Sequence, residues 1–413
     1  MTLDTLRADA RTEPYRRGTR GYTRITLALF AAGLATFISM YSAQALLPAL
    51  ADGFGVGPAT AALAVSATTG VLALVIVPAS ALSERFGRTR VMVVSAVASC
   101  AIGLLLPLSP SIEVLIAGRA VQGATLAGVP AVAMAYLAEE VHGHDLGAAM
   151  GRYVAGTTIG GLVGRLIPAT VLDLASWRWA MEAAAVTALA FAVITARAVP
   201  ASRRFRPQPV GPRVLTANLL EHLRDPRLRI LFGLGFLLMG GFVSAYNFLG
   251  FRLLCDPFDL PESVVGLVFL IYLAGTVTSS VAGRLADRIG RSRVLLASIG
   301  CAMVGLACTL AASLPWVLAG MLVFTGGFFA AHSVASGWVG LLATRHRAEA
   351  SALYLFAYYL GSSVAGAGAG IAYGAGRWPA AVGYVAILLA AGFGLATWMA
   401  RLGRASTAAG ALR

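Results

Sequence analysis

Five polar side chains interrupt long apolar runs of the sequence and are candidates for coupling transport to protons. They are Arg119, Gln122, Arg165, Glu182 and His332. An ionisable side chain inside an apolar span is costly unless it is paired or faces water, so such residues are typical of ion and proton pathways. We hypothesise that Glu182 pairs with Arg165 or Arg119 and that protonation breaks the pair. His332 is the second candidate because imidazole titrates near neutral pH; a satisfied core histidine is the alternative.

Uncharged polar and aromatic side chains near the middle of the same apolar runs form a second set. They are Tyr41, Gln44, Tyr246, Asn247, Tyr358 and Tyr359. Aromatic and amide walls suit a bulky, partly apolar small molecule, so we expect these residues to line a substrate cavity. If the deep arginines are not matched by acids, this cavity favours neutral or anionic ligands. The alternative for each residue is an ordinary hydrogen bond between helices.

The elements that position these side chains are expected to lie inside a membrane. Of the 413 residues, 58% are hydrophobic and 12% are charged, and the mean hydropathy is +0.79. A soluble protein of this size could not cover so much apolar material, which excludes soluble enzymes, secreted disulfide scaffolds and disordered chains. Apolar runs of spanning length are expected near 25–47, 59–81, 91–108, 112–137, 148–171, 178–198, 229–250, 263–283, 294–313, 316–342, 350–373 and 379–400.

The distribution of arginine predicts how the chain crosses the membrane. The net charge is +14, and all 32 basic residues are Arg. They recur in short clusters between apolar runs rather than on one face with interleaved aromatic residues, so a nucleic-acid partner is not expected. Most of these clusters fall on the side that holds the N-terminus. Because positive charge marks the cytoplasmic side, we expect both termini in the cytoplasm and the chain in the plasma (inner) membrane.

A polar segment rich in arginine and proline divides the apolar runs into two halves. We expect a short amphipathic helix within this segment, around residues 215–223. The expected regions are a cytoplasmic N-terminal tail (1–24), an N-terminal six-helix bundle (25–198), a cytoplasmic linker (199–228), a C-terminal six-helix bundle (229–400) and a cytoplasmic C-terminal tail (401–413).

A short motif repeats between the second and third spans of each half. Residues 80–90 read SALSERFGRTR and residues 283–293 read GRLADRIGRSR, with acid, Arg, Gly and Arg in register. Glycine permits a sharp turn, and the carboxylate can cap a helix or pair with Arg across the loop. A latch that forms in only one conformation is expected; the alternative is that the arginines only fix topology. The latch residues are Glu84, Arg85, Gly87, Arg88, Gly283, Asp287, Arg288, Gly290 and Arg291.

These two loops resemble the signature loops of the major facilitator superfamily. The resemblance to this superfamily extends over essentially the whole chain. The motif is complete in the second half, whereas in the first half Ser80 replaces the leading Gly and Glu84 replaces Asp. Residues 119–123, RAVQG, resemble the Arg-x-x-Gln-Gly motif of the same superfamily.

A glycine stripe in the fifth apolar run resembles the antiporter motif of efflux members. Gly156, Gly160 and Gly164 recur every four residues, which gives one smooth face for close helix packing. Gly161 stands in place of the usual Pro and Arg165 in place of the last Gly. Packing alone is the alternative role for this stripe.

Three further runs resemble the acriflavine-sensitivity (YnfM-type) branch: residues 40–48 (MYSAQALLP), 128–140 (GVPAVAMAYLAEE) and 336–340 (SGWVG). The resemblance implies an all-α membrane protein with twelve transmembrane helices in two pseudo-symmetric six-helix bundles. It also implies secondary active transport by alternating access, as proton-coupled efflux (antiport) of a small amphipathic drug or metabolite. Uptake or facilitated transport, by symport or uniport, is the alternative.

No reactive constellation typical of an enzyme occurs in the sequence. It contains no P-loop, HExxH motif or dinucleotide-binding glycine fingerprint, and its four Cys lack metal-binding spacing. We therefore expect no enzymatic activity, no cofactor and no metal. The expected partners are a small-molecule substrate, protons and the lipid bilayer, with the chain acting as a monomer. A membrane enzyme or a non-transporting receptor is the alternative from another class.

Overall fold

The computed structural model describes residues 13–205 and 211–411. Within these ranges the chain forms helices, and the single strand-like feature is an isolated bridge between Tyr15 and Val141. The expected tails and linker are described in part, because 1–12, 206–210 and 412–413 lie outside the described residues. The all-helical fold expected from the sequence is confirmed.

The helices follow one another with short connections, and their bounds are as follows. Before the linker lie α2 (Arg20–Tyr41), α3 (Leu47–Phe54), α4 (Pro58–Phe86), α5 (Arg88–Leu105), η1 (Leu106–Leu108), α6 (Ile112–Leu126), α7 (Gly128–Glu140), α8 (Gly143–Leu172) and α9 (Trp177–Ala198). After it lie α10 (Pro212–Arg224), α11 (Pro226–Leu253), α12 (Glu262–Leu267), η2 (Val268–Ile271), α13 (Tyr272–Ile289), α14 (Arg291–Cys308), α15 (Leu314–Leu342) and α16 (Arg347–Ala411). The amphipathic helix expected within the linker corresponds to α10.

The number of spans agrees with the sequence. Among the described residues, 11 helical segments are long and apolar enough to cross a membrane. The last of them, Glu349–Leu402, holds two spans, because α16 is broken at Gly376 (φ −157°, ψ 28°) and Arg377 (φ 50°, ψ −144°). These torsion angles lie outside the helical region, so the chain turns there and begins another helix. The expected twelve spans are therefore present.

The first span is shorter than expected. We expected an apolar helix over 25–47, but α2 ends at Tyr41 and turns lead into α3, which has Pro48 in its first turn. Proline has no N–H to donate and fits the first turn of a helix but not its interior. Pro48 therefore begins a second helix rather than extending the first.

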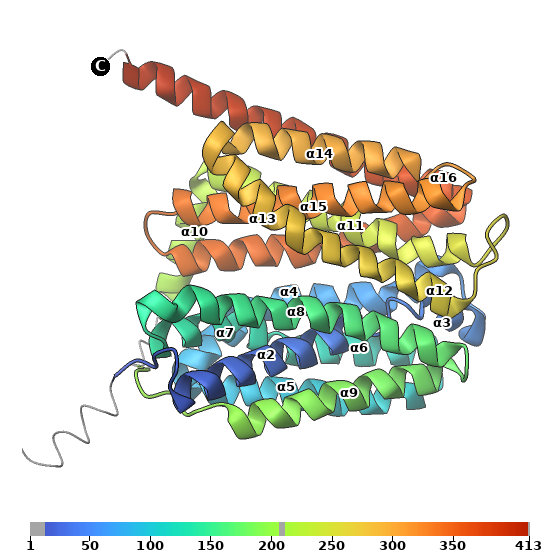
Figure 1. Ribbon diagram of the computed structural model, residues 1–413, viewed down its shortest axis with the longest axis horizontal. Helices are drawn as coiled ribbons and strands as arrows, with labels where there is room; N and C mark the ends of the chain where they lie inside the picture. Colours follow the sequence, from blue (N-terminus) through green and yellow to red (C-terminus); the bar gives the residue numbers. More distant parts are fainter. Residues whose placement is uncertain (1–12, 206–210, 412–413) are drawn as a thin grey trace, which may run out of the picture. The chain divides into compact units, whose positions relative to one another are not determined.

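By their contacts the helices form two compact units. Unit 1 comprises Met1–Ala43 and Leu74–Val210, and unit 2 comprises Gln44–Ala73 and Gly211–Arg413. In unit 1, α2 packs against α8 and α9, which run beside it in Figure 1; in unit 2, α15 packs against α13 and α14. Residues 44–73, which hold α3 and the first half of α4, contact the helices that follow the linker.

Glycine allows α2 and α8 to approach closely in unit 1. A Cβ atom on Gly156 would meet the carbonyl of Phe30, and one on Gly160 would lie 2.8 Å from Cα of Leu34. Gly164 repeats the relationship, with Cα of Ile38 at 2.7 Å. These contacts place the glycine stripe of α8 against the backbone of α2, which is the central helix of the unit 1 core.

The same arrangement recurs in unit 2. Gly361 of α16 lies against the carbonyl of Phe236 in α11, so any side chain at position 361 would clash with backbone. Gly361 is the residue that aligns with Gly160 in the internal repeat, and Phe236 occupies the place of Leu34. The same glycine-to-backbone contact thus occurs in both units, in agreement with the internal repeat that the two loop motifs indicate.

Candidate functional site

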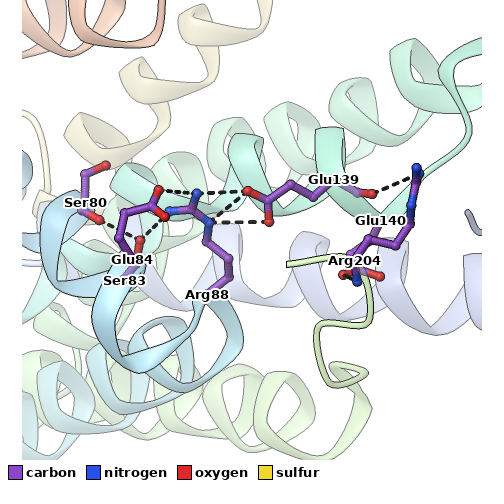
Figure 2. A network of polar contacts seen from close by, with 7 residues as sticks. All are labelled: Ser80, Ser83, Glu84, Arg88, Glu139, Glu140 and Arg204. Carbon is purple, nitrogen blue, oxygen red and sulfur yellow. Dashed lines mark hydrogen bonds and ion pairs between the residues drawn. The ribbon is translucent and has the colours of Figure 1, made fainter. Parts of the chain in front are cut away.

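A buried arginine joins three helix ends at the first loop motif. Arg88, the first residue of α5, forms ion pairs with Glu84 of α4 and with Glu139 of α7 (Figure 2). Its Nη2 lies 2.9 Å from Oε1 of Glu139, and its Nη1 donates to Oγ of Ser83 over 2.6 Å. Only 8% of the Arg88 side chain is exposed. Hydrogen bonds between charged partners are about twice as strong as neutral ones, so these contacts hold the three helix ends together.

The turn before Arg88 depends on glycine. Gly87 has φ 92° and is the single residue between α4 and α5, and Gly290 has φ 96° between α13 and α14. Residues with a Cβ atom rarely adopt such angles. The two glycines therefore let each loop reverse the chain within one residue and bring its acid close to its Arg.

The second loop motif makes a weaker set of contacts. Asp287 and Arg291 form an ion pair at 3.1 Å, but their side chains are 71% and 36% exposed. Exposed pairs of this kind contribute little to stability. A Cβ atom on Gly283 would meet nothing within 4 Å, so packing does not explain the glycine there. The structure thus shows one well-buried polar network and one exposed pair at two loops that share a sequence motif.

Two other predicted latch residues, Arg85 and Arg288, have different surroundings from Arg88. Arg85 lies with its guanidinium carbon 5.4 Å from the ring centroid of Phe86, its neighbour in sequence. For Arg288, the described part of the chain provides no ion pair within 4.0 Å. Neither residue joins the network around Arg88.

Glu139, near the end of α7, lies outside the loop motif and is not among the residues that the sequence predicts for the site. Its neighbour Glu140 is 1% exposed and accepts the backbone N–H groups of Arg203 and Arg204, at 2.7 and 2.9 Å. The Arg204 guanidinium also donates to the Glu139 carbonyl over 3.3 Å, as Figure 2 shows. The pair of acids at the end of α7 was the available signal, but only the fold places it beside Arg88, 51 residues away.

Arg119 is completely buried in unit 1 and binds backbone oxygens. It donates to the carbonyls of Ser39 and Met40, at 2.8 and 2.6 Å, and to Oε1 of Gln122 at 2.5 Å. Gln122 in turn donates to the carbonyl of Ser99 over 2.9 Å. The two carbonyls belong to the last turn of α2, where the helix leaves acceptors unsatisfied and carries partial negative charge. Arg119 therefore caps α2.

Arg165 lies on an aromatic face. Its guanidinium carbon is 3.9 Å from the ring centroid of Tyr41, and it donates to the carbonyl of Gly161. Within the described residues, Glu182 forms no ion pair with Arg165 or Arg119. The pair that we hypothesised is not formed in this structure; Arg119 uses the carbonyls of α2 instead.

Unit 2 brings three of the cavity candidates together. Nε2 of Gln44 donates to Oδ1 of Asn247 over 2.7 Å, and both residues are at most 2% exposed. The hydroxyl of Tyr246 lies 2.7 Å from Oγ1 of Thr325. A small cavity borders this cluster, with Gln44, Tyr246 and Phe269 in its wall. The amide nitrogen of Asn247 is buried without a hydrogen-bond partner.

A second cluster in unit 2 contains the only histidine among the candidates. Nδ1 of His332 lies 2.9 Å from the hydroxyl of Tyr354, and its ring lies between Phe328 and Tyr358, with centroids at 5.9 and 4.7 Å. Tyr359 meets the ring of Tyr358 edge-on at 5.2 Å. Three aromatic side chains therefore pack around the imidazole, and the hydroxyl of one of them shares a hydrogen bond with it.

No metal centre is evident in the part of the chain that the structure describes. Groups of three or more His, Cys, Asp or Glu that could hold a metal ion do not occur among these residues. The polar clusters consist of arginine, carboxylate, amide, hydroxyl and imidazole groups.

Comparison with known proteins agrees with this chemistry. The chain is 42% identical over 374 residues to the inner membrane transport protein YnfM of Escherichia coli (strain K12), covering 91% of this chain and 90% of that protein. It is 38% identical over 386 residues to the MFS-type transporter YybF of Bacillus subtilis (strain 168), covering 94% and 96%. These relatives are transporters and not enzymes.

The fold itself matches solved transporters. The peptide transporter POT, crystallised with sulfate, superposes with a TM-score of 0.77 over 98% of both chains, at 12% sequence identity. The model of the Major Facilitator Superfamily matches residues 29–261 and 253–410. The chain therefore belongs to the Major Facilitator Superfamily and is a multi-pass membrane transporter.

Proposed function

We propose that this transporter exports a small amphipathic molecule in exchange for protons by alternating access. The observation that carries the proposal is the buried cluster of Gln44, Tyr246 and Asn247, which combines aromatic walls with an unpartnered amide donor. An amide and a phenol recognise polar atoms of a ligand, while the rings accommodate its apolar body. The resemblance to the acriflavine-sensitivity branch favours efflux over uptake.

The proposed substrate contacts extend from the amide pair into α4. Oγ of Ser66 is also buried without a hydrogen-bond partner. A Cβ atom on Gly366 would lie 3.2 Å from this oxygen and 3.6 Å from Nδ2 of Asn247. Both polar atoms thus lie near the Cβ position of Gly366, which has no side chain. Because a buried polar group without a partner is costly, a ligand that accepts from the amide and bonds to the hydroxyl would be stabilised there.

The proposed proton carrier is His332. When the imidazole is neutral, Nδ1 can accept a hydrogen bond from Tyr354; when it is protonated, Nδ1 must donate instead. Protonation thus reverses this hydrogen bond and adds a positive charge against the ring of Tyr358. Either change alters how α15 meets α16, which provides a means of linking proton binding to movement of these helices.

The network around Arg88 serves, in this proposal, as the latch of one conformation. Its contacts join α4, α5 and α7, so any movement that separates these helix ends must break two ion pairs. We further propose that residues 25–198 and 229–400 act as the two bundles of a monomer in the plasma (inner) membrane, with both termini cytoplasmic. The arginine-rich tails and linker support this orientation.

Everted membrane vesicles provide the test. Vesicles with and without the protein are energised, and a panel of neutral, anionic and cationic dyes is added while a pH-sensitive probe reports the proton gradient. An export substrate dissipates the gradient only in vesicles that contain the protein. If a transported dye leaves the gradient unchanged, the protein is a uniporter; if the dye accumulates only in right-side-out vesicles with inward proton flow, it is a symporter. Either result contradicts proton-coupled efflux.

A further inference from the structure

A strongly basic cavity lies at the beginning of α2 in unit 1. Its volume is about 400 Å³. Arg16, Arg20, Arg24 and Arg203 line it, together with one acid, Glu13. The arginines come from three parts of the chain: the segment before α2, the first turns of α2 and the segment after α9. None of them belongs to the network around Arg88 or to the substrate cluster.

Buried contacts fix the walls of this cavity. The N–H of Tyr15 donates to the Glu140 carbonyl over 2.7 Å, and the N–H of His142 donates to the Tyr15 carbonyl over 3.0 Å. The Tyr15 ring, 8% exposed, occupies the place that a Cβ atom would take at Gly21. The buried carboxylate of the same Glu140 accepts the backbone N–H of Arg203 over 2.7 Å. The segments before α2 and after α9 are therefore held in defined positions.

The positive charge of the cavity is not neutralised within the described chain. None of the four guanidinium groups forms an ion pair with a carboxylate among the residues that the structure describes. Arg203 lies 5.0 Å from the ring centroid of Tyr15, and Arg24 contacts the carbonyl of Arg197 at 3.5 Å. The N-terminus of α2 adds partial positive charge. A confined group of uncompensated cations attracts an anion, and arginine suits phosphate because it donates two parallel hydrogen bonds.

Exposed apolar side chains lie on α2 and α9 within one turn of arginines at this end of unit 1. Leu27, three residues after Arg24 on the same face of α2, is 50% exposed. Ile194, three residues before Arg197 on α9, is 38% exposed. Because α2 and α9 pack together and α2 begins to cross the membrane here, phosphate would meet the arginines while acyl chains lie on Leu27 and Ile194. We propose that this cavity binds the phosphate group of an anionic phospholipid.

Native mass spectrometry of the full-length protein in detergent tests the proposal. The probes are dioleoylphosphatidylglycerol, dioleoylphosphatidylcholine and inorganic phosphate. We expect the protein to retain one phosphatidylglycerol more tightly than phosphatidylcholine. The double variant Arg20→Gln/Arg24→Gln should bind phosphatidylglycerol at least about tenfold more weakly, because each lost hydrogen bond to a charged group weakens binding by roughly that factor.

Two further variants complete the test. Arg224→Gln/Arg229→Gln removes the same charge from exposed positions outside the cavity and should bind the lipid as the native protein does. Arg16→Gln/Arg203→Gln alters only residues outside the helices, so it serves if the α2 variant unfolds, and it should also bind more weakly. Equal binding by cavity and control variants, or equal binding of the two lipids, would overturn the proposal. Inorganic phosphate that binds as tightly as the lipid, and is lost in the same variants, would assign the cavity to a soluble phosphate instead.

Discussion

Arg88 donates through Nη2 to Oε1 of Glu139 over 2.9 Å, which joins the start of α5 to the end of α7. The corresponding arginine of the second half, Arg291, has only Asp287 as an acidic partner within the described residues, and that pair is exposed. The two loops therefore share a sequence motif but differ in what holds them. The difference comes from Glu139, which lies outside the motif.

The first prediction concerns this asymmetry. Glu139→Gln should lower the free energy of unfolding by roughly 1–3 kcal/mol, because it removes one charged partner of a buried arginine. Asp287→Asn, the matched control, should lower it by less than about 1 kcal/mol, because its ion pair is exposed. Thermal unfolding in detergent measures both changes. Equal losses in the two variants would contradict the distinction between the loops.

The second prediction concerns the glycine stripe of α8. Gly160→Ala should destabilise the protein by about 1–3 kcal/mol, because the new Cβ atom would lie 2.8 Å from Cα of Leu34 and force α2 and α8 apart. Gly147 lies on the same helix with nothing within 4 Å of its Cβ position. Gly147→Ala should therefore be neutral or stabilise by up to about 1 kcal/mol. In thermal unfolding, the midpoint should fall for Gly160→Ala and should stay unchanged or rise for Gly147→Ala.

The third prediction concerns the cap of α2. Arg119→Met should destabilise unit 1, because the carbonyls of Ser39 and Met40 and the amide of Gln122 would lose their donor in a buried place. Each buried acceptor left unsatisfied costs about 1–3 kcal/mol. Arg119→Lys should recover part of the loss, since an ammonium group keeps the charge but cannot reach all three acceptors in the same geometry. Expression level and unfolding temperature distinguish the variants, and a native-like Met variant would refute the capping role.

The fourth prediction concerns proton coupling. His332→Gln preserves a hydrogen-bonding group beside Tyr354 but cannot change charge, so transport should lose its pH dependence while downhill flux continues. Glu182→Gln is the comparison, because Glu182 forms no ion pair with either deep arginine in the described structure. Flux into proteoliposomes at several pH values measures both. Loss of pH dependence in the Glu182 variant alone would move the coupling site to α9.

The fifth prediction concerns the contact between Gln44 and Asn247. A bifunctional thiol reagent that joins Gln44→Cys to Asn247→Cys, with the four native cysteines replaced, should block transport until the link is cleaved, because in the proposed alternating-access cycle a substrate that binds between these two residues separates them. The control pair, Ser244→Cys and Ala365→Cys, joins neighbouring residues of α11 and α16 that lie within the second half and should not block it. Undiminished flux through the linked Gln44–Asn247 protein would exclude movement at this contact.

Much of the architecture was accessible from the sequence alone. Apolar runs between arginine clusters predicted the spans, since a segment that crosses the bilayer must bury its backbone polar groups within a helix of sufficient length. The repeated loop motif and the glycines at 160 and 361 indicated the internal duplication, because both record local requirements of the backbone: a left-handed turn and a close helix approach. The short first span was the exception, and Pro48 was the local signal for it.

The partners of the charged groups were decided by the tertiary structure. The sequence suggests that Glu182 pairs with Arg165 or Arg119, yet Arg119 binds carbonyls at the end of α2, and no pattern of side chains reveals which backbone oxygens a fold leaves unpaired. Glu139 contacts Arg88, and Arg165 contacts Tyr41, although the two residues of each pair lie on different helices. The hydrophobic periodicity of a single helix does not predict contacts of this kind. Spans and turns follow from the chain's local chemistry, whereas pairing depends on which helices become neighbours when they pack.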